Sequence, residues 1–303
     1  MAVESLSNPR ENLPNVFTDV TVREVDFVSR FQTSWKALQD ILGIMNPIKK
    51  ENGTTLATYT SSVTLTDGDV DAGCVIPYSK ATVVESVVGD IKIQKYAKAT
   101  TIEDVEKYGA KNAIERTDKA FLNQLQSKIT GDFYDFLLDD TSAITDTYGT
   151  FQKAVSMAIG LVKDKFDTMD KTVTEVAVFV NTLDLYEYLG DNGVTLQTAF
   201  GLQYLKDYLG ATLMFVSSKI PHGKVVSTPV ENIVPYYVDP ASSDFAKMGL
   251  QYTIDGDAGT PFIGVKVVGN YGTAVGEMFA IMGVKLIAEY SDGVAIVAID
   301  ENP

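Results

Sequence analysis

The longest stretch with one repeating hydrophobic pattern runs from Thr101 to about Leu138. Its apolar side chains recur at steps of mostly three, four or seven residues: Val105, Tyr108, Ile114, Phe121, Leu125, Ile129 and Phe133. This spacing places them on one stripe of a single long helix. Thr101 followed by Asp104 predicts the start of the helix, and Gly109 and Gly131 are weak points that each cost about 1 kcal/mol relative to alanine. The stripe indicates a scaffold helix that packs along a sheet or another helix.

The first part of the chain predicts an arm followed by a helix. Residues 1–30 contain Pro9 and Pro14 and show little periodicity, which favours an extended arm that a neighbour orders. From Val25 to Leu42, apolar residues at Phe27, Phe31, Trp35, Leu38 and Leu42 predict a short amphipathic helix. Gly43 is expected to end it.

From Ile48 to Thr100 the period changes toward two, which is typical of strands. A strand over 54–65, a turn at Thr66-Asp67-Gly68-Asp69 and a return through Gly73-Cys74-Val75-Ile76-Pro77-Tyr78 predict a long hairpin. Its outer part has too few apolar residues for a core of its own, and a two-stranded ribbon is marginal in isolation. Two further strands are expected at 83–88 and 91–96, leading into the long helix.

The remaining chain alternates helices and strands in an α+β arrangement, with mostly antiparallel strands. A second amphipathic helix is expected over 151–166, a buried strand over 175–180, and a helix capped by Asn181 or Thr182 that runs to about Leu189. Another short helix is expected over 202–209. Further strands are expected at 211–216, 224–227, 233–238, 250–254, 262–268, 283–289 and 294–299.

The amino-acid composition and the net charge argue against several classes of protein and of site. A single cysteine excludes an intrachain disulfide, and the single histidine with that cysteine cannot build a structural zinc site within one chain. Neither a signal peptide nor an apolar run long enough to span a bilayer is present, so the chain is expected to be cytoplasmic and soluble, with no membrane partner. The net charge is −15, and no basic block interleaved with aromatic residues occurs, which disfavours dedicated nucleic-acid binding.

Candidate chemistry is sparse. The acidic segment from Asp67 to Gly73 resembles the start of a calcium loop, but its glycine falls one place late and Tyr78 stands where a bidentate acid belongs, so a plain acidic hairpin tip is favoured. His222 lies between Pro221 and Gly223, which indicates a surface turn rather than a general base. Cys74 is interpreted as a small buried hydrophobe rather than a nucleophile. No catalytic constellation and no cofactor-binding pattern remain, so the chain is not expected to be an enzyme.

The order of these features along the chain resembles that of a known protein family. An arm, a hairpin returning through Gly73-Cys74-Val75-Ile76-Pro77, and Thr100-Thr101-Ile102-Glu103-Asp104 opening a long helix resemble a tailed-bacteriophage major capsid protein of the Hong Kong 97 type. The later segment Val216-Ser217-Ser218-Lys219-Ile220-Pro221-His222-Gly223-Lys224 and the ending from Ile287 to Ile299 are similar as well. The likeness covers most of the chain and is one of layout and short phrases.

The resemblance implies a Hong Kong 97-like capsid fold with four parts. They are an N-terminal arm (1–43), an extended hairpin called the E-loop (44–80), a peripheral domain with the spine helix (81–167 and 245–285), and an axial domain (168–244 and 286–303). Copies would form pentamers and hexamers of an icosahedral head, assembled in the bacterial cytoplasm, that encloses double-stranded DNA contacted non-specifically. At the E-loop tip, Thr66, Asp67, Gly68, Asp69 and Val70 would contact a neighbouring subunit.

The resemblance also sets expectations about partners. No lysine lies between Glu51 and Ser79, so the hairpin tip has no donor for a lysine–asparagine cross-link. The arm is too short for a cleavable scaffolding domain, which implies a separate scaffolding protein, and a portal is also expected. Two alternatives remain open: an encapsulin-type nanocompartment shell, which shares the architecture, and a monomeric enzyme or binding module, which requires a convergent polar pocket.

Overall fold

The computed structural model describes residues 16–42, 47–71, 74–139, 141, 143–190, 193, 195–254 and 261–300. Contacts divide the chain into two compact units. Unit 1 holds the described residues up to Thr33 together with 93–122 and 239–283, and unit 2 holds 34–92, 123–238 and 284–300. Two long helices, α1 (Val16–Leu42) and α3 (Ala110–Leu137), contribute residues to both units.

Unit 1 is built on a three-stranded antiparallel sheet. Its strands are β12 (Ile263–Asn270), β13 (Val275–Met282) and β4 (Gln94–Thr101), with β13 in the centre. Helix α2 (Ile102–Tyr108) follows β4 directly, because the Thr101 side chain accepts a hydrogen bond from the backbone N–H of Asp104. A short helix, α6 (Ser243–Lys247), precedes β12.

Unit 2 contains a seven-stranded mixed sheet. In spatial order the strands are β5 (Ile144–Tyr148), β15 (Ala295–Ile299), β10 (Lys224–Pro229), β6 (Val176–Val180), β9 (Ala211–Val216), β8 (Leu202–Tyr208) and β7 (Gln197–Ala199). Helices α4 (Phe151–Thr168) and α5 (Thr182–Leu189) belong to this unit. Most strand pairs in the described chain are antiparallel; β6–β9, β5–β15 and β1–β11 are parallel.

The core of unit 2 explains why β6 is apolar at every position. Val176, Val178 and Val180 pack with the apolar stripe of α4, while Phe179 points to the opposite face. There its ring meets Phe133 and Tyr134 of α3 edge-on, at centroid distances of 5.7 and 5.9 Å, and stacks on Phe215 at 5.1 Å. A strand covered on both faces needs apolar side chains at consecutive positions, as the sequence predicted.

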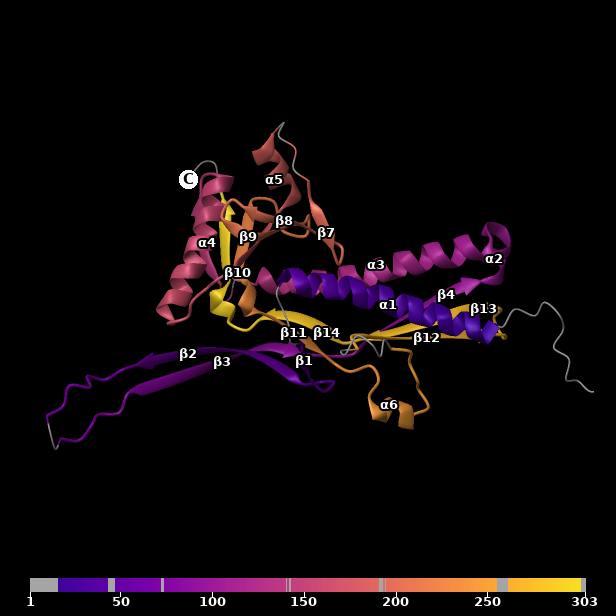
Figure 1. Cartoon of the computed structure of the whole chain (residues 1–303), viewed down its shortest axis with the longest axis horizontal. Coiled ribbons are helices and arrows are strands. Elements are labelled where there is room, and N and C mark those ends of the chain that lie inside the picture. Colours follow the sequence, from indigo (N-terminus) through magenta and orange to yellow (C-terminus); the bar gives the residue numbers. More distant parts are fainter. Residues whose placement is uncertain are drawn as a thin grey trace, which may run out of the picture. The chain divides into compact units, whose positions relative to one another are not determined.

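Unit 2 also carries a small sheet and a ribbon. The small sheet has the order β1 (Ile48–Lys49), β11 (Ile233–Tyr237) and β14 (Val284–Ala288). Strands β2 (Thr55–Thr64) and β3 (Lys80–Asp90) form the two-stranded ribbon, which runs as a pair in Figure 1. Two short 3₁₀ turns, η1 (Val230–Asn232) and η2 (Ser291–Gly293), complete the unit.

Several predictions from the sequence are confirmed. The predicted weak point Gly109 breaks the long helix into α2 and α3, since its φ of 79° lies in the left-handed region that favours glycine. Gly131 lies inside α3 without ending it. Asn181 caps α5, and its side chain accepts the backbone N–H of Leu183. The expected strand over 175–180 and the helix over 151–166 are present as β6 and α4.

Other predictions are wrong. Helix α1 begins at Val16, so residues 16–24 are helical where an extended arm was expected. The segment predicted as a helix over 202–209 is β8, because pairing with β7 and β9 decides between a helix and a strand where the apolar spacing suits both. Strand 83–88 is part of the second arm of the ribbon rather than an extra strand, and β5 and β13 were not predicted. Residues 1–15, Gly43 and Gly73 lie outside the described residues.

Candidate inter-subunit contact surface

One face of the ribbon is exposed and mostly apolar, with Glu85 as a charged exception. Directly opposed residues of an antiparallel pair lie on the same face, as do residues two apart on one strand. Tyr59 pairs with Glu85 and Val63 with Ala81, which places Tyr59, Val63, Val83 and Val87 together. Their exposed fractions are 46, 64, 65 and 65%. These four residues are the apolar ribbon face.

The opposite face of the ribbon is mostly polar and, near the base of the ribbon, contacts the 3₁₀ turn η2. It carries Thr64, Lys80, Thr82 and Ser86, with Val84 as the apolar exception. Thr58, also on this face, is buried, and its hydroxyl donates to the carbonyl of Ser86 at 3.3 Å and lies 3.4 Å from the hydroxyl of Ser291. The apolar ribbon face is therefore the one turned away from this contact with η2.

The loop between the two strands adds more exposed apolar surface. Leu65, Val75, Ile76 and Tyr78 are 80, 88, 72 and 98% exposed. The two sides of the loop are joined where the Thr66 hydroxyl donates to the carbonyl of Tyr78 at 2.9 Å. Burying side chains of this size stabilises by roughly 1.5–3 kcal/mol each, so the ribbon and its loop offer a strong driving force for association.

The structure places the predicted tip residues Thr66, Asp67, Gly68, Asp69 and Val70 together in this loop, and all of them are exposed. The Asp67 carboxylate accepts the backbone N–H of Asp69 at 3.1 Å, a local turn contact. The largest apolar side chains lie beside these residues rather than among them. The sequence prediction missed the apolar ribbon face, although the spacing of Tyr59 and Val63 on one strand and of Val83 and Val87 on the other, each an even number of residues apart, was the signal that could have found it.

Two single-residue predictions have different outcomes. Cys74 is exposed, so its interpretation as a buried hydrophobe is wrong; the loop that holds it has no core in which to bury it. His222 lies in an exposed turn, as predicted. Its ring also contacts the carboxylate of Asp184, which the sequence did not indicate because 38 residues separate the two positions. Burial raises the pKa of Asp184, while the N–H of Gly223 and the imidazole of His222 act in the opposite direction.

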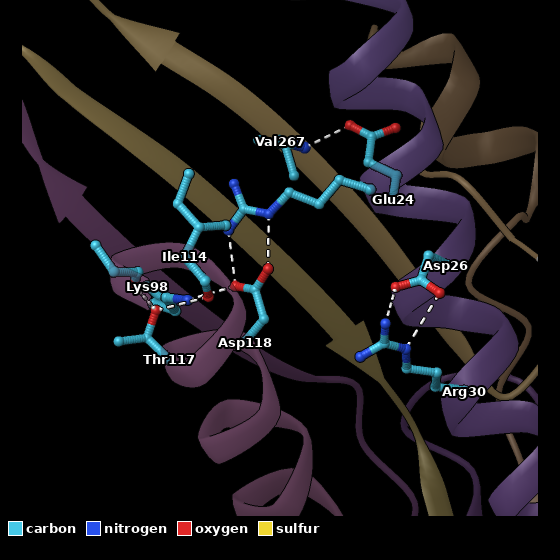
Figure 2. A network of polar contacts seen from close by, with 10 residues as sticks. Glu24, Asp26, Arg30, Lys98, Ile114, Thr117, Asp118 and Val267 are labelled. Carbon is cyan, nitrogen blue, oxygen red and sulfur yellow. Dashed lines mark hydrogen bonds and ion pairs between the residues drawn. The ribbon is translucent and has the colours of Figure 1, made fainter. Parts of the chain in front are cut away.

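Within unit 1, a polar network holds α1 on the sheet and on α3. Glu24 is almost fully buried. Its carboxylate accepts a hydrogen bond from the backbone N–H of Val267 at 2.5 Å (Figure 2). It also accepts a hydrogen bond from the hydroxyl of Thr253 at 2.5 Å. Asp118 accepts two hydrogen bonds from Arg23 at 2.7 Å and one from Lys98. These contacts hold Arg23 and Glu24 in place within the part of α1 that was expected to be an extended arm.

The charged groups of this network shift one another's pKa values. Burial acts to raise the pKa of Asp118, but the hydrogen bonds from Arg23 and Lys98 outweigh it, and the pKa lies below its usual value. Burial lowers the pKa of Lys98, which its contact with Asp118 only partly offsets. By contrast, Asp26 and Arg30 form an exposed pair one turn apart on α1 (Figure 2).

Comparisons with known proteins show which solved structures align with this chain. No family model and no curated protein matches the chain. The solved capsid of cyanophage A-1(L) aligns with a TM-score of 0.53 at 12% identity, covering 99% of this chain and 99% of that chain. The capsid of an empty GTA particle aligns with a TM-score of 0.50 at 8% identity, covering 87% of this chain and 89% of that chain.

The chain has the Hong Kong 97-type capsid fold. The α+β class expected from the sequence is confirmed with it. At these identities the likeness concerns the fold alone. The holo-SrpI encapsulin of Synechococcus elongatus PCC 7942 also aligns, at 12% identity over 88% of this chain and 89% of that chain, but its TM-score of 0.48 adds nothing to the assignment. None of the helices in the described part of this capsid-like chain has the length and apolar character needed to cross a bilayer.

Proposed function

We propose that this chain is a structural, shell-forming protein that assembles with copies of itself, and that the shell is the head of a tailed bacteriophage. The observation that carries the proposal is the apolar ribbon face. Of the 21 large hydrophobic side chains that are exposed in the described chain, 10 lie between Tyr59 and Val87. Exposed apolar surface concentrated on a ribbon without a core is typical of an element that becomes buried on another molecule.

The occupant of this surface is a second copy of the same chain. The capsid fold supports this choice, since both aligned structures are capsids and one of them is described with fivefold symmetry. The predicted contact at Thr66–Val70 then extends along the ribbon to the apolar ribbon face. The four-part division into arm, E-loop, peripheral domain and axial domain remains a prediction within this proposal.

A matched pair of variants tests self-assembly. Val83→Glu places a charge on the apolar ribbon face, and Thr82→Glu places the same charge one residue away on the polar face. We expect Val83→Glu to stop shell formation, because an unpaired carboxylate would be buried at the contact, and Thr82→Glu to assemble like the unmodified chain. Sedimentation velocity and negative-stain electron microscopy measure the particles, and circular dichroism checks that both variants fold. Assembly by the folded Val83→Glu variant would contradict the proposed contact.

The contents of the shell test the finer part of the proposal. Pentamers and hexamers that close into a virion head, with help from a separate scaffolding protein and a portal, would enclose double-stranded DNA. An encapsulin-type shell would instead enclose an enzyme. Nuclease-protected DNA in particles purified from the native host supports the phage head, whereas a co-purifying protein cargo without DNA supports the encapsulin. A chain that stays monomeric at all concentrations refutes both.

The absence of lysine from the hairpin tip predicts shells without covalent cross-links at this position. Particles heated in denaturant should release single chains on an electrophoresis gel. A ladder of covalent multimers would contradict this part of the proposal.

A further inference from the structure

The single histidine of the chain lies beside two carboxylates at one edge of the seven-stranded sheet. Strands β6 and β9 are parallel, so their carboxyl ends meet at the same edge. Helix α5 follows β6 at this edge, and the segment after β9 leads to His222. The Asn181 side chain joins the two segments, since its amide donates to the carbonyl of Ile220 at 2.5 Å.

Asp184 holds the histidine ring in one orientation. One of its carboxylate oxygens lies 2.8 Å from Nδ1 of His222, and the other accepts the backbone N–H of Gly223 at 2.9 Å. The Asp184 side chain is only 4% exposed, so the burial and the second hydrogen bond fix the carboxylate in place. A hydrogen bond from Nδ1–H to a carboxylate leaves the lone pair of the neutral imidazole on Nε2.

The Nε2 atom faces a second acid. The carboxylate of Glu187 comes to 3.9 Å from Nε2, too long for a hydrogen bond. Both side chains are open to solvent, with exposed fractions of 59% for His222 and 69% for Glu187. Two ligands of a tetrahedral zinc ion, each at about 2.0–2.1 Å, lie about 3.4 Å apart, so a small rotation of the exposed Glu187 side chain would bring both atoms within reach of one ion.

We propose that Nε2 of His222 and the carboxylate of Glu187 bind a zinc-class divalent ion, with Asp184 as the residue that positions the imidazole. The carboxylate–histidine–metal arrangement is the one by which proteins commonly fix the tautomer of a ligating histidine. Imidazole with one carboxylate suits Zn²⁺, Ni²⁺ or Co²⁺ better than Mg²⁺ or Ca²⁺, which prefer oxygen ligands alone. Water fills the remaining positions on an unassembled chain. This inference does not depend on the proposed shell function.

The sequence argument against a zinc site concerned a histidine and a cysteine in one chain. The structure places Cys74 in the exposed loop of the ribbon and gives His222 two carboxylates instead. Among the described residues, Asp184, Glu187 and His222 form the group of potential ligands whose atoms all lie within 4.8 Å of one another.

The single histidine makes the test direct. The unassembled full-length chain, stripped with a chelator and labelled with ¹⁵N-histidine, is titrated with Zn²⁺ at constant pH while both ring nitrogens are followed by NMR. We expect saturable binding that shifts Nε2 strongly and leaves Nδ1 hydrogen-bonded to Asp184. Co²⁺ should show visible absorption bands on binding. A shift confined to Nδ1, or no saturable binding, overturns the proposal.

Variants separate the ligands from the positioning residue. Glu187→Gln and His222→Gln remove exposed side chains and should each weaken Zn²⁺ binding at least tenfold and abolish the Co²⁺ bands. Asp184→Asn should weaken binding by about 10–100-fold, as loss of a residue that orients a ligand commonly does. Glu231→Gln, an exposed acid elsewhere in unit 2, is the control and should bind like the unmodified chain. Unchanged affinity in the folded Glu187→Gln variant, or displacement of Zn²⁺ by millimolar Mg²⁺, would refute the assignment.

Discussion

The buried strand β6 and the ribbon strand β3 are both rich in valine, yet they lie in opposite surroundings. Every residue of β6 is at most 2% exposed, because α4 covers one face and the aromatic residues of α3 and β9 cover the other. In β3, Val83, Val84 and Val87 are 59–65% exposed. The same residue type thus builds a core in one part of the chain and, on the ribbon, an exposed apolar surface.

The two regions are expected to affect two different free energies, that of unfolding and that of association. Substitutions in β6 change the free energy of unfolding of the chain itself. If the proposed contact forms, substitutions on the apolar ribbon face are expected to change the free energy of association and to leave the isolated fold nearly untouched, because the removed groups contact solvent there. A measurement on unassembled chains therefore distinguishes the two regions.

The largest effect on folding is expected for Phe179→Ala. It removes the ring contacts with Phe133, Tyr134 and Phe215, and should lower the free energy of unfolding by about 4 kcal/mol. Val83→Ala, on the ribbon, should change it by less than about 0.5 kcal/mol. Urea denaturation of unassembled chains, followed by circular dichroism, measures both. A comparable loss in the two variants would mean that the ribbon is folded onto its own chain.

A smaller loss is expected for Asp118→Ala in unit 1. The variant leaves Arg23 and Lys98 without their partner at a site where these side chains are only 21 and 13% exposed. We expect unfolding to become easier by about 3 kcal/mol, near the lower end of the range for breaking a buried pair. Asp26→Ala, which breaks the exposed pair with Arg30, is the control and should cost less than about 0.5 kcal/mol. Equal costs in the two variants would show that burial does not strengthen the Asp118 network.

The smallest effect is a loss of stability in acid. Because the pKa of Asp118 is lowered in the folded chain, its contribution is fully present above the unfolded value of about 3.9 and is lost as the pH falls through the lower folded value. Thermal unfolding between pH 6 and pH 2.5 should therefore show a steeper decline for the unmodified chain than for Asp118→Asn. Parallel curves for the two proteins would show that Asp118 does not contribute to the acid sensitivity.

The elements that could be predicted from the sequence are those whose own side chains decide their structure. Asn181 caps α5 through a side chain that reaches only two residues along the chain, and Gly109 breaks the long helix because its backbone angle favours glycine. The segment 202–209 could not be assigned in this way. Its apolar spacing suits a helix and a strand alike, and only pairing with β9 decides between them.

The candidate sites show the same division. Local turn residues predict that Thr66–Val70 leave the strand, and in the structure they belong to the loop between β2 and β3. Whether the apolar residues of β2 and β3 share one face depends on the register between the two strands, and a shift of one residue would place those of one strand on the opposite face. The contact of His222 with Asp184 depends on the parallel pairing of β6 with β9, which no local pattern specifies.

By itself, the sequence determined the α+β class, the scaffold helix with its break at Gly109, the buried strand β6 and a hairpin without a core, because periodicity, capping and backbone preferences act over a few residues. Only the tertiary structure decided how far α1 extends, where the exposed valines point and what surrounds the histidine. Those features depend on contacts such as Glu24 with Val267, between groups far apart in the chain, whose energies arise only after folding has brought them together.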